Sequence, residues 1–129
     1  MKRIEQRYED YCKALSRLKE ALNEEMSEIV IDGTIQRYEF TFELAWKLMK
    51  DYLEYNGLME NIASPRGVIQ QAYQAEIIKD GEMWIQMMLD RNAMSHLYDE
   101  EKSRGIYDNI KEKYVQQFEN LQEFLLNEM

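Results

Sequence analysis

Apolar side chains recur every three or four positions along most of this chain, and this period restricts the fold more than anything else in the sequence. In an α-helix such spacing places the apolar residues on one face, whereas a half-buried strand needs them at every second position. Only one proline and five glycines interrupt the 129 residues, and these are the residues that most often mark turns. The pattern predicts an all-α fold, an up-and-down bundle of four main helices plus one shorter helix, in a single domain over residues 1–129.

Local signals set the expected helix boundaries. Asp32 is a suitable N-cap for the second helix, and Gly57 ends it. Ser64 followed by Pro65 is typical of a helix start, because serine caps the free amides and proline fits the first turn. The first three expected helices cover residues 4–22, 32–57 and 64–81. The fourth runs from residue 82 into the segment 91–98, and the fifth begins around 103–105.

The second expected helix is apolar on two faces. One stripe runs from Ile35 to Tyr52, and a second consists of Phe40, Leu44 and Leu48. A helix with two apolar faces is either central in its bundle or shared with a partner. We expect one face in the core and the other in a homodimer interface.

Charge and composition exclude several classes of protein. The net charge is −9, so a broad basic surface for nucleic acid is not expected, and any RNA contact has to be local. The mean hydropathy is −0.66 and no run is long enough to span a bilayer. No signal peptide is expected at the N-terminus, and the single cysteine excludes a disulfide framework, so we expect a cytoplasmic protein.

The segment 91–98 carries the residue types that suggest chemistry. It contains Arg91, Asn92, Ser95, His96 (the only histidine) and Tyr98. Arginine offers forked donors to phosphate oxygens and to the charge of a pentacoordinate transition state. Histidine exchanges a proton near neutral pH, and the amide and hydroxyl suit a positioning role. This combination fits phosphodiester cleavage without a metal or other cofactor.

Helical geometry complicates this interpretation. Arg91 and His96 are five residues apart and would point about 140° from each other in a regular helix. They share one site only if the helix ends or distorts near Ser95, or if a two-fold partner supplies a second copy of each. In the alternative interpretation, Arg91 pairs with an acid such as Asp90 or Glu43, and His96 is a polar residue at a helix end.

The segment 37–47 also has two interpretations. Glu39, Glu43 and Lys47 have the spacing of ordinary ion pairs on a helix surface. Alternatively, Arg37, Glu43 and Lys47, together with Trp46, line a cleft or face a partner.

The spacing of Arg91, His96 and Tyr98, with the tryptophan–lysine pair at 46–47 and the helix start at 64–66, resembles the HEPN superfamily, in the branch called HepT or nucleotidyltransferase substrate-binding proteins. The resemblance implies a homodimeric helical bundle that is paired with a minimal nucleotidyltransferase. It implies that Arg91 and His96 form a ribonuclease pair, with Asn92 following the arginine, and that Tyr98 is adenylylated by the partner. Further positive charges suited to guiding RNA, or simply to a solvated surface, are Arg66, Lys102 and Arg104.

Three hypotheses about function follow. The protein is a metal-independent endoribonuclease toxin silenced at Tyr98, or a non-catalytic subunit that binds substrate or nucleotide for a transferase. The intact Arg91, His96 and Tyr98 favour the first, and the net charge of −9 favours the second. A plain helical dimer without chemistry is the third, and it is all that the periodicity alone would support.

Overall fold

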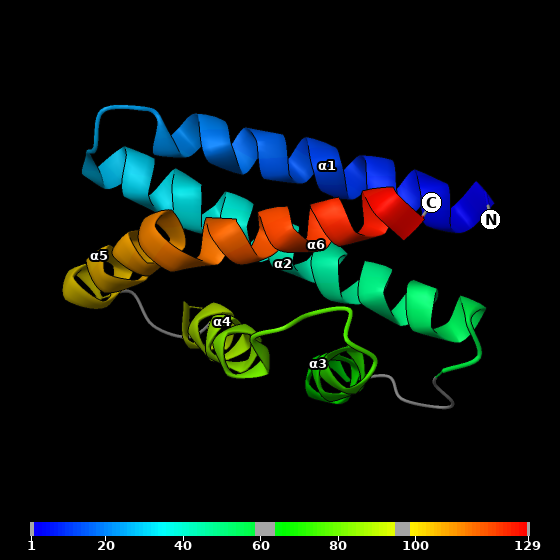
Figure 1. The fold of residues 1–129 in the computed structure, drawn as a ribbon. Helices are drawn as coiled ribbons and strands as arrows, with labels where there is room; N and C mark the ends of the chain where they lie inside the picture. The colour runs from blue at the N-terminus through cyan, green and yellow to red at the C-terminus, as the bar shows by residue number, and fades with distance from the viewer. Residues whose placement is uncertain (1, 59–63, 95–98, 129) are drawn as a thin grey trace.

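The computed structural model describes residues 2–58, 64–94 and 99–128, and every regular element within these ranges is helical (Figure 1). This confirms the prediction of an all-α bundle. The elements are α1 (Lys2–Leu22), α2 (Glu28–Tyr55), α3 (Pro65–Gln74), α4 (Gly81–Met94), α5 (Glu100–Asn109), the π-helical turn η1 (Ile110–Tyr114) and α6 (Val115–Glu128).

Three long helices form the body of the bundle. In Figure 1, α1 and α2 run antiparallel, α6 lies along them, and α3 and α4 cross below and are seen nearly end-on. The Tyr11 hydroxyl donates to the Phe118 carbonyl oxygen at 2.6 Å, and Lys19 pairs with Glu119 at 2.7 Å. These contacts fix α6 against α1. The Tyr38 hydroxyl of α2 donates to the Met87 carbonyl oxygen at 2.6 Å, and this bond holds α4 against α2.

The core is one apolar cluster to which all six helices contribute. Its centre consists of aromatic rings, with Trp84 of α4 edge-on to Phe118 at 5.6 Å and Tyr38 of α2 stacked on Tyr114 at 5.6 Å between ring centroids. In the last helix, the helical period of the sequence predicts one apolar stripe, which consists of Tyr107, Ile110, Tyr114, Phe118, Leu121 and Leu125. All of these residues are buried. Period-based reasoning therefore identified the core-facing residues of this helix correctly.

The second stripe of α2 divides between core and solvent. Leu48 is fully buried and Leu44 is half-buried, but the Phe40 side chain is 62% exposed. The stripe therefore enters the core at its C-terminal end and leaves an aromatic side chain in solvent at the other.

The expected start of the second helix at Asp32 is wrong. The helix begins at Glu28, and its N-cap is Ser27, whose hydroxyl accepts a hydrogen bond from the Val30 amide at 3.1 Å. Serine and aspartate are comparable caps. The earlier start adds a turn in which Ile31 packs against the core, and this tertiary contact favours Ser27.

Two further boundaries differ from expectation. The third helix ends at Gln74 and not at 79–81, because Glu76 adopts a left-handed conformation with φ of 62° and turns the chain. The fifth expected helix begins at Glu100 and not near 103–105, because the Asp99 carboxylate accepts a hydrogen bond from the Lys102 amide at 3.1 Å and caps the helix.

Within the described ranges, no helix combines the length and apolar character that crossing a membrane requires.

Candidate functional site

Arg91 lies in the last described turn of α4, where it faces α2. Its Nη2 lies 2.5 Å from Oε2 of Glu43, and the two side chains are 25% and 30% exposed. The guanidinium carbon also lies 5.9 Å from the centre of the Phe42 ring, in the range of a cation–π contact. The Glu43 carboxylate and the Phe42 ring of α2 therefore both hold Arg91. The expected pairing with Glu43 is confirmed, whereas the part of that interpretation that concerns His96 lies outside the described residues.

Glu43 connects Arg91 to two more residues of the 37–47 segment. Its Oε2 also accepts a hydrogen bond from Trp46 Nε1 at 3.0 Å, and its Oε1 lies 3.3 Å from Lys47 Nζ. Partial burial alone would raise the pKa of Glu43, but the Trp46 hydrogen bond and the charges of Arg91 and Lys47 outweigh it and lower the pKa. Glu43 is therefore ionised at neutral pH and fixes the position of Arg91.

A second carboxylate lies one turn earlier on α2. Burial raises the pKa of Glu39, and the positive charge of Arg91 opposes this rise. Arg91 therefore lies in the field of two carboxylates, one of which bonds it directly. This arrangement limits how strongly Arg91 attracts a further anion before that anion makes contact.

Asp90, the other expected acid partner of Arg91, points to a different element. Its carboxylate accepts hydrogen bonds from the Tyr114 hydroxyl, from Asn109 Nδ2 at 3.4 Å and from Gln86 Nε2 at 3.1 Å. Burial, followed by the Asp90 hydrogen bond and charge, raises the pKa of Tyr114 well above its ordinary value, so Tyr114 stays a hydrogen-bond donor. This cluster attaches α4 to η1 immediately beside Arg91.

The π-helical turn makes this attachment possible. The Val115 amide bonds to the Ile110 carbonyl oxygen, five residues earlier, so one extra residue is accommodated before Tyr114. Sequence reasoning placed Tyr114 in the core stripe but did not identify its hydroxyl as a ligand for Asp90. No single-sequence pattern marks a π-turn, so this contact had no usable signal.

Several candidate residues lie elsewhere or outside the described residues. Asn92 is exposed on α4, one residue after Arg91. Arg37 lies in a groove between α1 and α2, where its Nη1 donates to the Arg17 carbonyl oxygen at 2.6 Å, and not with Glu43 and Lys47. The structure does not describe Ser95, His96 or Tyr98, so the expected meeting of Arg91 and His96 stays a prediction.

The two remaining candidate arginines are surface residues. Arg66 is exposed in the first turn of α3. Arg104 of α5 is 52% exposed and lies 3.4 Å from Asp108, one turn later.

In the described part of the chain, no three His, Cys, Asp or Glu side chains gather in a way that would hold a metal ion.

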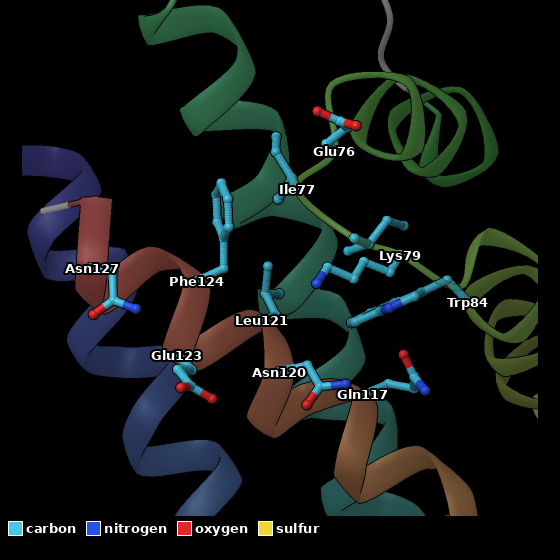
Figure 2. Close-up of a pocket in the computed structure, with 11 residues that line it drawn as sticks. Glu76, Ile77, Lys79, Trp84, Gln117, Asn120, Leu121, Glu123, Phe124 and Asn127 are labelled. Carbon is cyan, nitrogen blue, oxygen red and sulfur yellow. The ribbon is translucent and has the colours of Figure 1, made fainter.

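Figure 2 shows a pocket of about 360 Å³ between α6 and the connection from α3 to α4. Lys79 and Trp84 line one side of it, and Asn120 and Phe124 of α6 line the other. None of its lining residues belongs to the Arg91–Glu43 cluster. Sequence reasoning did not single out this pocket, because its walls combine residues from distant parts of the chain.

Comparison with known proteins identifies the family. Residues 6–127 match the family described as nucleotidyltransferase substrate binding protein like. The chain belongs to this family. The resemblance drawn from the 91–98 motif is thereby confirmed.

The chain is also similar to a curated protein and to two solved structures. A protein of Haemophilus influenzae named "Probable ribonuclease HepT" is 29% identical over 94 residues, and the match spans 70% of this chain and 64% of that protein. A crystal structure from Thermus thermophilus is 34% identical, with a TM-score of 0.75 over 92% of this chain and 97% of that one. A structure from H. influenzae, described as revealing the fold of a substrate binding domain of a nucleotidyltransferase, is 24% identical with a TM-score of 0.81. The match covers 92% of this chain and 98% of that one. This last likeness supports the fold.

Proposed function

We propose that the protein is a metal-independent endoribonuclease of the HepT type that a minimal nucleotidyltransferase holds inactive. The observation that carries the proposal is the arginine presented by α4 and fixed by Glu43 at 2.5 Å, directly before the segment that contains His96. The relative named "Probable ribonuclease HepT" supports the same reaction class.

In the proposed reaction, the ribose 2′-oxygen attacks the adjacent phosphorus as His96 takes its proton. The bond to the 5′-oxygen breaks, that oxygen takes a proton from a second imidazole, and the products carry a 2′,3′-cyclic phosphate and a free 5′-hydroxyl. Arg91 stabilises the charge that develops on the phosphoryl oxygens. Because each chain has one histidine, the acid and the base come from the two copies in a homodimer.

The ion pair with Glu43 is compatible with this role of Arg91. A guanidinium has five N–H donors, so an arginine can bond to a carboxylate and to a phosphate at the same time. A donor held in place beforehand loses less entropy on binding a phosphate. Glu43 therefore serves as the positioning group for Arg91, and Asn92 and Ser95 contact the phosphate or orient the imidazole.

Regulation follows from Tyr98 in the same proposal. Transfer of an adenylyl group to its hydroxyl by the partner transferase places bulk and a negative charge close to Arg91 and His96 in the sequence. An added phosphate repels the RNA backbone and competes for the arginine. Removal or absence of the modification releases the ribonuclease, which is the behaviour of a toxin under an antitoxin.

A second function has its own support. The matched family and the H. influenzae structure are both described in terms of substrate binding for a nucleotidyltransferase. The charge of Arg91 is already matched by Glu43, and the chain carries a net charge of −9, which disfavours RNA. In this alternative, the protein is a non-catalytic subunit that presents a substrate or nucleotide to its transferase.

RNA cleavage in EDTA distinguishes the two functions. Wild type should cleave, Arg91→Ala and His96→Ala should not, and Lys111→Ala, which changes an exposed lysine of η1, should cleave like wild type. If wild type is inactive, its intact mass is decisive. A gain equal to AMP on Tyr98 indicates a silenced ribonuclease, whereas an inactive and unmodified protein supports the substrate-binding subunit.

Light scattering tests the homodimer separately. The shared site requires two chains per particle at micromolar concentration. A mass equal to one chain, measured in a preparation that cleaves RNA, would exclude a site built from two copies.

A further inference from the structure

A groove of about 630 Å³ runs between α1 and α2. Its walls include Lys13 and Arg17 of α1, and Arg37 and Phe40 of α2. Neither the family description nor the 91–98 motif assigns a role to this surface. It lies along the same helix, α2, that carries Glu43.

The groove differs in charge from the molecule around it. Three cations line it against one carboxylate, Asp10, whereas the whole chain has 16 basic and 25 acidic residues. Asp10 accepts a hydrogen bond from Gln6 at 3.1 Å. Glu20, the acid nearest to Arg37, lies 4.0 Å from its Nη1, at the limit of an ion pair. Cations are therefore concentrated here in a chain that is otherwise acidic.

Arg37 is held in the groove by the main chain. Its Nη1 donates to the Arg17 carbonyl oxygen at 2.6 Å, which ties it to the second turn from the end of α1. The side chain nevertheless remains 46% exposed. A guanidinium has five N–H donors, so Arg37 can make this bond and still donate to a phosphate.

Phe40 is the aromatic wall of this groove, and its ring is 62% exposed. It precedes Glu43 by three residues and Lys47 by seven, so the three side chains lie on neighbouring parts of one helix surface. Since Glu43 contacts both Lys47 and Arg91, the helix surface that carries Phe40 also carries the residue that holds Arg91.

We propose that this groove binds a single-stranded segment of RNA, with Lys13, Arg17 and Arg37 contacting phosphates and a base stacking on Phe40; the inference rests on the proposed ribonuclease function. Cations around an exposed aromatic ring are the combination that single-strand sites use. A duplex keeps its bases stacked internally and offers none to Phe40. The groove thus holds the strand beside the bond that is cut and supplies locally the attraction that the overall charge lacks.

Fluorescence anisotropy with a labelled single-stranded RNA of about 12 nucleotides tests the inference, because the probe is long enough for a single-strand site. The measurement uses the full chain with His96→Ala, so that the probe is not cut. Phe40→Ala should weaken binding about tenfold, and Phe40→Trp should restore it. Arg17→Ala should weaken binding and reduce the slope of log K against log salt by about 0.7, whereas Arg17→Lys should keep the slope.

Two controls match these variants. Leu126 has the same exposed fraction as Phe40, 62%, and Leu126→Ala should leave the affinity unchanged. Lys111→Ala removes an exposed lysine outside the groove and should also leave it unchanged. Affinity that is equal in wild type, Phe40→Ala and Arg17→Ala, or no binding by wild type, overturns the inference.

Separate readouts distinguish failure of this inference from failure of the proposed function. Groove-dependent binding without any cleavage by the chain with His96 intact and Tyr98 unmodified contradicts the ribonuclease and supports the groove. Cleavage that the groove variants leave unchanged contradicts the groove alone. If Phe40→Ala halves the mass measured by light scattering while Arg17→Ala binds RNA normally, the surface is an interface between copies and the inference is wrong.

Discussion

Replacing Tyr114 by phenylalanine is expected to destabilise the protein more than a comparable change at Tyr11. Both rings are fully buried, and both hydroxyls donate one hydrogen bond across the bundle. Tyr114 donates to the carboxylate of Asp90, whereas Tyr11 donates to a neutral carbonyl oxygen. Phenylalanine preserves the ring contacts in each case, so the comparison isolates the acceptor.

The structure sets the expected magnitude. A hydrogen bond to a charged group contributes about 1.5–3 kcal/mol, and one between neutral groups about 1 kcal/mol. Asp90 keeps Gln86 at 3.1 Å and Asn109 at 3.4 Å when the Tyr114 hydroxyl is removed. These remaining donors limit the loss, so we expect about 2 kcal/mol for Tyr114→Phe and about 1 kcal/mol for Tyr11→Phe.

Urea unfolding followed by circular dichroism measures the difference, at one protein concentration because association would contribute. With a slope of about 2 kcal/mol per M, the midpoint should fall by about 1 M for Tyr114→Phe and by about 0.5 M for Tyr11→Phe. A double-mutant cycle with Asp90→Asn should give a coupling above about 0.5 kcal/mol. Equal losses in the two tyrosine variants, or no coupling, would refute the assignment of Asp90 as a charged acceptor that attaches α4 to η1.

Two more expectations concern stability. The pKa of Glu43 is lower in the folded protein than in the unfolded chain, where it is about 4.3. Ionised Glu43 therefore stabilises the folded protein above this unfolded pKa, and the stabilisation is lost as the pH falls through the lower folded pKa. Glu43→Gln should therefore lower the urea midpoint at pH 7, and the gap to wild type should close in acid; a gap that is the same at both pH values would contradict this. Ser27→Ala should cost about 1 kcal/mol because it removes the N-cap of α2, whereas Asp32→Ala should change little, and the reverse order in thermal unfolding would restore Asp32 as the cap.

The local sequence sufficed for the parts of the candidate site that lie on one helix. Glu43, Trp46 and Lys47 are spaced within four residues, and the structure joins them as helical geometry requires. The pairing of Arg91 with Glu43 was one of two alternatives, because acids at positions 43 and 90 were equally plausible from the sequence. Only the packing of α4 against α2 chose between them.

Two groupings that rest on nearness in the chain are wrong. Nearness in the chain groups Arg37 with Glu43, but the two side chains point about 120° from each other on α2. Arg37 instead lies in the groove between α1 and α2. Asp90 was considered for Arg91 because it is adjacent, yet the π-turn before Val115 brings the Tyr114 hydroxyl to it. The separation of Arg37 from Glu43 follows from the helical period of α2, whereas the Asp90 contact depends on how α4 packs against η1.

By itself, the sequence determined the helical class, most of the buried positions and the residues able to do chemistry, because helical periodicity and side-chain type are local properties. The tertiary structure decided which of several good caps begins α2, which acid holds Arg91, and where the scarce cations gather around Phe40. Those outcomes depend on contacts between residues tens of positions apart. Such contacts form only when the apolar faces of all the helices are buried together, so one chain segment cannot specify them alone.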